Sequence, residues 1–269
     1  MTTGSTYIHG INQGEQSRLT ILNKILNKKC LEKISIPPGA RILDVGSGLG
    51  LMTQAFSVHA GPTGFCLGIE RSKEQLEKSL TLKNEGLHFR EGDVQKLPLL
   101  AEEIGTFDLV YARFILEHLP EPQQAVNEMR RALCDGGKIV LADDDHQAMI
   151  LFPEPEGFQQ LWTAYIDSFI EIGNDPFIGR KLPRLLHESG FADVKNDIVF
   201  FGDTAGSETF REYINNLSEV ITTAKSVMLE YNFISAPQFE AALASLLKWS
   251  ELSYATAYYP LCLATGTKQ

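Results

Sequence analysis

Short apolar runs alternate with amphipathic stretches between about residues 40 and 145. The apolar runs have the length of strands and lie at 41–46, 65–70, 87–91, 107–112 and 138–143. The stretches between them at 51–60, 73–84 and 122–134 have helical spacing and polar faces. Regular alternation of this kind predicts βαβ units, and therefore an α/β fold with a parallel sheet that carries helices on both faces.

The pattern changes outside this region. A helix is predicted over 15–33, where Leu19, Leu22, Ile25 and Leu26 form an apolar stripe. Beyond residue 147 the spacing predicts helices over 156–172, 179–189, 207–230 and 236–250, and strands over 193–202 and 257–266. The glycines of the segment 134–138 predict a turn between the helix that ends near Leu133 and the strand that follows.

The composition indicates which kinds of binding partner and which cellular compartment suit the protein. The net charge of -10 disfavours a nucleic-acid backbone or an anionic membrane as the main partner. Four widely spaced cysteines indicate free thiols in a reducing compartment, and no signal-peptide pattern or membrane-length apolar run is present. These features predict a cytoplasmic protein without membrane insertion, while its oligomeric state cannot be read from the sequence.

The segment "ILDVGSGLGLMT", residues 42–53, places Gly46, Gly48 and Gly50 between a strand and a helix. Glycines at such a turn let a ligand approach the backbone closely, although an ordinary turn has the same composition. Glu70 ends the second strand, where it can accept both hydroxyls of a ribose, and Asp93 ends the third, where it can face an adenine amine or cap a turn. These strand ends predict a nucleoside-binding edge.

The glycine spacing disfavours a dinucleotide, whose usual pattern is GxGxxG, and no lysine follows to hold a triphosphate. Asp44 precedes the glycines inside the strand. Its carboxylate suits a ligand with a cationic amino-acid end, or it accepts hydrogen bonds from the loop.

At about residues 38–145 the chain resembles the class I (Rossmann-type) S-adenosylmethionine-dependent methyltransferases of small-molecule type. The resemblance rests on "LDVGSGLG", on Glu70, on Asp93 with Val94, and on the segment 107–143; Ser47 stands where the family often has cysteine. It implies a doubly wound, mostly parallel seven-stranded sheet, with 257–266 as an antiparallel strand beside 193–202. It also implies S-adenosylmethionine as cofactor, S-adenosylhomocysteine as product, and the following cofactor-binding residues: Asp44, Gly46, Ser47, Gly48, Gly50, Glu70, Arg71, Asp93, Val94 and Arg113.

The same resemblance implies a division into a lid and a capped domain. Residues 1–37 would form an N-terminal helical lid, in which Tyr7 and His9 either close the pocket or belong to a frayed end. Residues 38–269 would form the methyltransferase domain, with helical insertions at about 147–190 and 205–252 that roof the acceptor site. The aromatic stripe on 156–172 is then either core or acceptor-pocket wall.

The candidate catalytic residues are Asp144, His146 and Arg113. The run "ADDDH" follows the fifth strand, so Asp144 or His146 can act as a proton acceptor or amine anchor, or can merely end the strand in solvent. Consecutive extended residues alternate in direction, which disfavours a metal site, and none is predicted. Arg113 ends the fourth strand, where it can pair with the cofactor carboxylate, an acidic acceptor or a neighbouring acid; His118 is a general base or a packing residue.

The resemblance implies transfer of a methyl group to an O, N or C atom of a small molecule. Three alternatives stay open: ring C-methylation of a quinone or polyprenyl compound, a cyclase that uses the cofactor only for its charge, and a catalytically silent S-adenosylmethionine-binding scaffold protein.

Overall fold

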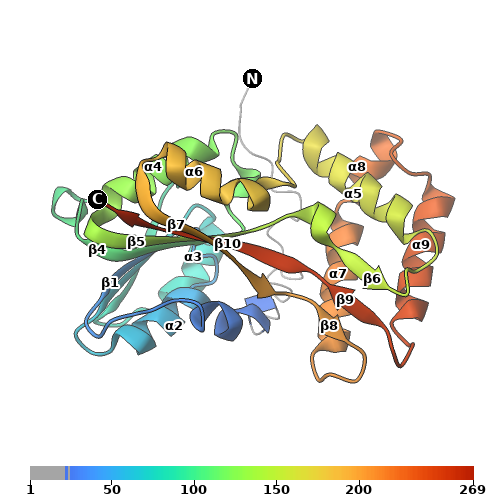
Figure 1. Cartoon of the computed structure of the whole chain (residues 1–269), viewed down its shortest axis with the longest axis horizontal. Helices are drawn as coiled ribbons and strands as arrows, with labels where there is room; N and C mark the ends of the chain where they lie inside the picture. Colours follow the sequence, from blue (N-terminus) through green and yellow to red (C-terminus); the bar gives the residue numbers. More distant parts are fainter. Residues whose placement is uncertain (1–21, 24) are drawn as a thin grey trace.

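The computed structural model describes residues 22, 23 and 25–269, and its centre is a seven-stranded sheet (Figure 1). The strand order is β3-β2-β1-β4-β5-β10-β7, with β10 antiparallel to both of its neighbours and the other pairs parallel. The strands are β1 (Arg41–Val45), β2 (Phe65–Glu70), β3 (Leu87–Glu91), β4 (Phe107–Arg113), β5 (Leu133–Asp144), β7 (Phe191–Phe200) and β10 (Pro260–Lys268). The doubly wound sheet with an antiparallel last strand is therefore confirmed.

Helices cover both faces of this sheet because its strands are apolar on both sides. On β1, Ile42 packs into one core cluster while Leu43 and Val45 pack into the other. The first cluster includes side chains of α2 (Leu51–Ala60) and α3 (Lys73–Leu80), and the second includes side chains of α4 (Pro122–Ala132) and α6 (Leu182–Glu188). These layers hold the carboxyl ends of β1, β2, β4 and β5 in fixed relative positions.

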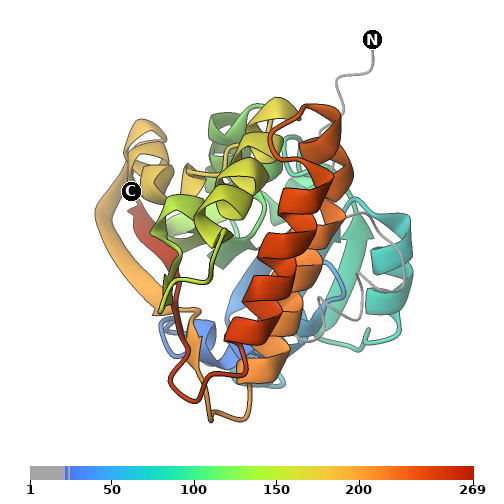
Figure 2. The ribbon, with the colours of Figure 1, turned by 90° about the vertical axis from the view of Figure 1, so that its right-hand side faces the viewer.

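Four helices lie beyond one end of the sheet and form a cap, which faces the viewer in Figure 2. They are α5 (Phe158–Glu171), α7 (Phe210–Thr223), α8 (Lys225–Glu230) and α9 (Ala236–Trp249). Helix α5 contacts α8 and α9, and α7 contacts the same two helices. Helix α6, which the sequence placed in the first insertion, instead contacts β7 and β10 and belongs to the sheet layers.

The single helix predicted over 207–230 is wrong, because the chain breaks into α7 and α8 at Ala224. The hydroxyls of Thr222 and Thr223 donate to the carbonyl oxygens of Ser218 and Val220 just before the break. Side-chain bonds of this kind compete with the helical ladder and favour its interruption.

The strand predicted over 257–266 is confirmed from Pro260 onward, but its predicted start is wrong. The chain forms β9 (Thr256–Tyr258), passes Tyr259, and begins β10 at Pro260. Strand β9 lies in a separate small sheet between β6 (Ile150–Phe152) and β8 (Asp203–Thr204). Proline at the first position of a strand suits this change of sheet because it has no N–H to donate.

The turn predicted over 134–138 is part of β5, which begins at Leu133. The pairing of β4 with β5 shifts register between Phe107 and Leu109, and Gly136 has φ 79°. The glycines thus permit an irregular strand start rather than a separate turn. Among the described residues, none of the helices combines the length and apolar character that crossing a membrane requires.

Candidate functional site: two adjoining cavities at the carboxyl edge of the sheet

The loop after β1 is held tightly against the next strand. The N–H groups of Gly46 and Ser47 donate to the Ile69 carbonyl oxygen at 2.9 and 3.0 Å. Gly46 has φ 72°, and a Cβ added there would lie 2.1 Å from Cδ1 of Ile115. Only glycine satisfies both the backbone conformation and the close approach at this position.

Glu70, at the end of β2, ties the loop to the following helix. Its Oε2 accepts from the Gly48 N–H at 2.8 Å, and its Oε1 accepts from the Ser72 N–H at 2.7 Å. A carboxylate has about four acceptor positions, so each oxygen keeps one for a ligand hydroxyl. Glu70 is therefore oriented by the backbone and still able to accept two further donors.

Asp44 is buried beneath the loop, with 3% of its surface exposed. Its Oδ2 accepts from the Thr53 hydroxyl of α2 at 2.6 Å, rather than from the loop amides. Burial raises the pKa of Asp44 to about 6, although the Thr53 hydrogen bond and the nearby Arg113 oppose the rise. A cationic group placed beside this carboxylate would favour its ionised form.

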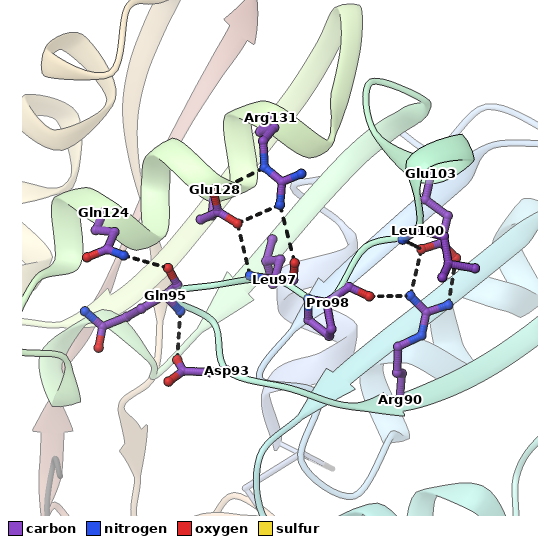
Figure 3. A network of polar contacts seen from close by, with 10 residues as sticks. All are labelled: Arg90, Asp93, Gln95, Leu97, Pro98, Leu100, Glu103, Gln124, Glu128 and Arg131. Carbon is purple, nitrogen blue, oxygen red and sulfur yellow. Dashed lines mark hydrogen bonds and ion pairs between the residues drawn. The ribbon is translucent and has the colours of Figure 1, made fainter.

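The segment after β3 is fixed by a polar network that also sets the place of Asp93 (Figure 3). Asp93 Oδ1 accepts from the Gln95 N–H at 2.8 Å, and Gln124 of α4 donates to the Gln95 carbonyl oxygen at 2.9 Å. Farther along, Arg90 forms a bidentate pair with Glu103 at 2.7 and 2.8 Å. Asp93 thus caps a turn, which was one of the two roles proposed for it. It also lies on the cavity wall described next.

These strand ends surround a cavity of about 560 Å³, which we call the first cavity. Nine of the ten predicted cofactor-binding residues line it: Asp44, Gly46, Ser47, Gly48, Glu70, Arg71, Asp93, Val94 and Arg113. Gly50 does not line it; a Cβ at Gly50 would meet the Phe89 ring at 2.7 Å, so this glycine serves helix packing.

The first cavity fits S-adenosylmethionine in size and in chemistry. Its volume lies within the range of small-molecule sites, about 300–1,000 Å³. The Ser47 hydroxyl is buried without a hydrogen-bond partner among the described residues, and Glu70 and Asp44 offer acceptors for hydroxyl and amino groups. Met52 also lines this cavity and belongs at the same time to the first core cluster.

Arg113 joins the end of β4 to the helical residues at 22, 23 and 25–31. Its Nη2 donates to Oδ1 of Asn23 and of Asn27, each at 2.8 Å, and its Nη1 contacts the Cys30 sulfur at 3.5 Å. The guanidinium therefore pairs with two amides, while lining the first cavity. Tyr7 and His9, the proposed lid contacts, lie outside the described residues.

A second cavity, of about 90 Å³, adjoins the first and lies under the cap. Leu22, Phe114 and His118 line both cavities. The remaining walls of the second cavity come from the end of β5, from α5 and α7, and from residues between the strands: Glu117, Asp144, His146, Met149, Trp162, Tyr165, Phe169, Phe201, Tyr213, Asn216, Leu217, Val220 and Tyr259.

The four polar residues 143–146, at the end of β5 and just after it, divide between structural and cavity positions. Asp143 accepts from the Ile115 and Leu116 N–H groups at 3.2 and 2.9 Å, and Asp145 forms a bidentate pair with Arg180 at 2.5 and 2.6 Å. Asp144 and His146 line the second cavity. Alternation along the chain thus selects the two residues that the sequence had proposed.

His146 lies among aromatic rings, with 3% of its surface exposed. Its ring stacks on Tyr165 at 5.4 Å and meets Phe169 edge-on at 4.8 Å, and its Nε2 lies 3.5 Å from Glu117 Oε2. Burial lowers its pKa, against the opposing effect of Asp144, so the imidazole is neutral at neutral pH. A neutral imidazole can accept a proton.

Asp144 is the second titratable group on this wall. Its Oδ1 is buried without a hydrogen-bond partner among the described residues. Burial, and next the charge of Glu117, raise the pKa of Asp144 well above its usual range, while His146 opposes the rise. The pair can therefore hold or exchange a proton beside the first cavity.

Sequence reasoning missed several residues of the second cavity, including Tyr259 and Glu117. Tyr259 lies between two short strands that the sequence pattern merged into one, so no local signal marked it. The aromatic stripe on α5 was predicted, and its members Trp162, Tyr165 and Phe169 are buried wall residues. Among the described residues, no group of three or more His, Cys, Asp or Glu side chains is arranged to hold a metal ion.

Comparisons with known proteins agree with this geometry. Residues 43–141 match the family model described as a methyltransferase domain. A protein of transposon Tn4556 from Streptomyces fradiae, described as uncharacterized, is 31% identical over 166 residues, which is 60% of this chain and 46% of that protein. This chain thus aligns with just under half the length of that relative.

A second relative is a named enzyme. The demethylmenaquinone methyltransferase of Staphylococcus aureus is 28% identical over 193 residues, covering 64% of this chain and 76% of that enzyme.

The crystal structure of a Bacillus halodurans protein assigned as a methyltransferase superposes with a TM-score of 0.59 at 17% identity, covering 91% of this chain and 99% of that one. Residues 43–141 are thus similar to methyltransferase domains, and the chain shares the fold of that solved structure.

Proposed function

We propose that this protein transfers the methyl group of S-adenosylmethionine to a small-molecule acceptor that binds in the second cavity. The observation that carries this proposal is the shared wall of Leu22, Phe114 and His118 between the two cavities. A cofactor in the first cavity and an acceptor in the second would be immediate neighbours.

The bound cofactor supplies a methyl group on a positively charged sulfur, and this sulfur leaves as a neutral thioether. The chain's own tasks are then to hold, orient and desolvate the two reactants. Glu70 and the loop amides orient the ribose side, Asp44 offers its carboxylate to the amino-acid end, and Asp93 with Val94 forms the adenine side.

At the acceptor, Asp144 and His146 provide the proton-accepting groups. Both lie on the second-cavity wall, and the ring nitrogen Nδ1 of His146 is buried without a hydrogen-bond partner among the described residues. A positioned acceptor of this kind contributes to catalysis when the acceptor atom must lose a proton.

Arg113 is proposed as a positioning residue rather than a catalytic one. Its bonds to Asn23 and Asn27 attach the helical residues 22, 23 and 25–31 to the edge of the first cavity. In this proposal residues 1–37 act as the lid, and 38–269 form the transferase domain with its cap. A cytoplasmic location belongs to the same proposal and is supported by the free thiols of all four cysteines.

Ring C-methylation of a quinone is the second candidate. It is supported by the similarity to the demethylmenaquinone methyltransferase of Staphylococcus aureus and by the aromatic walls of the second cavity. A quinone acceptor would place an apolar ring against these walls.

Two measurements test the proposed function. S-adenosylhomocysteine should raise the melting temperature, and labelled cofactor should pass its methyl group to a compound in a metabolite extract, which mass spectrometry then identifies. Stabilisation without any labelled product, at saturating cofactor, would support the silent scaffold instead. A product methylated on ring carbon would favour the quinone candidate.

A further inference from the structure

The second cavity presents aromatic rings from several elements at once. On α5, the rings of Trp162 and Tyr165 stack with centroids 4.8 Å apart. Elsewhere on the wall, the Phe201 ring lies 5.4 Å from that of Tyr213 and 5.9 Å from that of Tyr259. Aromatic faces attract cations, most strongly where water is excluded.

Carboxyl groups, rather than basic side chains, lie on the described part of the same walls. Asp144 and Glu117 line the cavity, and among the described lining residues there is neither lysine nor arginine. Oδ1 of Asp144 is buried and makes no full hydrogen bond with a described residue, although the neighbouring Tyr259 hydroxyl lowers the pKa of Asp144. A buried carboxylate oxygen in this condition is costly, and a cationic donor would relieve the cost.

This arrangement discriminates among acceptor classes. A phenolate, carboxylate or phosphate group would meet the carboxyl groups of Asp144 and Glu117 without gaining a cationic partner, and an ionised carboxylate there would repel it. A neutral ring would use the aromatic walls and leave the Asp144 oxygen without a partner. An ammonium group uses both the rings and the carboxylate.

Resting on the proposed methyl transfer, we propose that the acceptor is an amine, held in its ammonium form between the aromatic walls and the carboxylate of Asp144. Asp144 anchors the charge, and His146 takes the proton. The cavity of about 90 Å³ suits the amino group and its immediate substituents, while the rest of the acceptor lies toward the first cavity.

The reaction balances with the groups present. The ammonium gives one proton to the neutral His146 imidazole, and the freed lone pair on nitrogen forms the N–C bond to the methyl carbon. The C–S bond breaks with its electron pair staying on sulfur, so the thioether product is neutral. The positive charge of the cofactor appears on the N-methylated ammonium product, which stays beside Asp144 until release.

The first test compares two probes of the same shape. Choline and 3,3-dimethylbutan-1-ol differ only in having N⁺ or C at the branched centre, and both are titrated by calorimetry into protein saturated with S-adenosylhomocysteine. Choline is expected to bind at least about 10-fold more tightly, within the range of a desolvated cation–aromatic contact. Equal affinity, or tighter binding of the alcohol, would overturn the amine assignment.

A matched pair of substitutions locates the effect. Asp144→Asn should remove most of the preference for choline while S-adenosylhomocysteine affinity is retained, which shows that the fold persists. Asp135→Asn, at an exposed position in the irregular start of β5, should change neither. Unchanged choline preference in Asp144→Asn would contradict the anchoring role.

Product chemistry separates this inference from the function on which it rests. After incubation of a metabolite extract with labelled cofactor, the label is expected in products that bind a cation exchanger at pH 4. Label only in neutral or anionic products would overturn the amine acceptor and leave methyl transfer standing. Absence of label from every fraction would count against both.

Discussion

The two cavities differ in how they are built. Most of the first cavity comes from consecutive strand ends, so its key groups lie within the short stretches 44–48, 70–75 and 93–94. The second draws on Asp144, Trp162, Tyr213 and Tyr259, which are far apart in the sequence. The first combines backbone amides with the buried carboxylate of Asp44 and the exposed one of Asp93. The second combines buried rings with the titratable groups of Glu117, Asp144 and His146. The cofactor is thus recognised by a local pattern, and the acceptor by long-range packing.

Removing the buried imidazole should give the largest effect and should affect only the second cavity. His146→Ala is expected to lower kcat by about 10²–10⁴-fold, the usual contribution of a proton-accepting group, with S-adenosylhomocysteine affinity unchanged. The measurement is steady-state methyl transfer beside calorimetric cofactor titration. His59→Ala, on the exposed side of α2, is the control and should behave as wild type. Equal loss of both quantities would mean that the two cavities are not separable.

A glycine pair tests how rigid the first cavity must be. Gly46→Ala and Gly61→Ala both place a side chain at positive φ, 72° and 75°, but only the first meets an obstacle, Ile115. Gly61→Ala should cost about 1–3 kcal/mol of unfolding free energy from backbone strain alone, because its φ of 75° and ψ of -172° suit glycine. Gly46→Ala should cost about 1–3 kcal/mol more from overpacking, and should abolish cofactor binding. Urea unfolding measures both; equal costs would show that the loop moves freely.

Removing the carboxylate of Glu70 should weaken cofactor binding and leave acceptor binding unchanged. Glu70→Ala loses the bonds to Gly48 and Ser72 as well as the ribose acceptors, and the dissociation constant of S-adenosylhomocysteine should rise about 100-fold. Glu91→Ala, at the exposed end of the neighbouring strand β3, is the matched control. An unchanged dissociation constant in Glu70→Ala would remove Glu70 from the cofactor site.

Acid should gradually weaken the binding of the cofactor in the first cavity. The pKa of Asp44 in the ligand-free protein is about 6, raised chiefly by burial from 3.8. The contribution of Asp44 to the free energy of unfolding is fully present below its pKa in the unfolded chain. This contribution is lost as the pH rises from about 4 to 6, because the folded state binds the proton more tightly. A cationic ligand end needs the ionised form, so cofactor affinity should fall up to about tenfold per pH unit below about 6.

Calorimetry between pH 5 and 8 checks this dependence, with Asp44→Asn as the comparison. The variant should bind more weakly at pH 7 and show a flatter profile across the acid range. A wild-type profile that is equally flat would place the cationic end of the cofactor away from Asp44.

Most of the sheet and of the first cavity was predictable because their signals are local. The strand ends at Val45, Glu70 and Glu91 follow from apolar runs, and the glycine spacing after β1 follows from the loop's need for positive φ. Gly50 was assigned to the cofactor because it shares that spacing, but its contact with Phe89, thirty-nine positions away, decides its role.

The second cavity was predictable only in part. Asp144 and His146 were identified because they end a strand, and the α5 stripe because its spacing is helical. Tyr259 gave no such signal, since its burial depends on the change of sheet at Pro260. The break at Ala224 was likewise hidden, because no glycine or proline marks it and only the Thr222 and Thr223 side-chain bonds reveal it.

Leu22 borders both cavities, and it lies on the helical segment that Arg113 fastens to the end of β4. A reactant in either cavity would therefore contact a side chain that also forms the wall of the other cavity. The two substrates should follow a preferred order of entry, and the release of the larger product should wait for the Arg113 contacts with Asn23 and Asn27 to open. The helical segment that carries Leu22 would then limit the rate of turnover as well as closing the site.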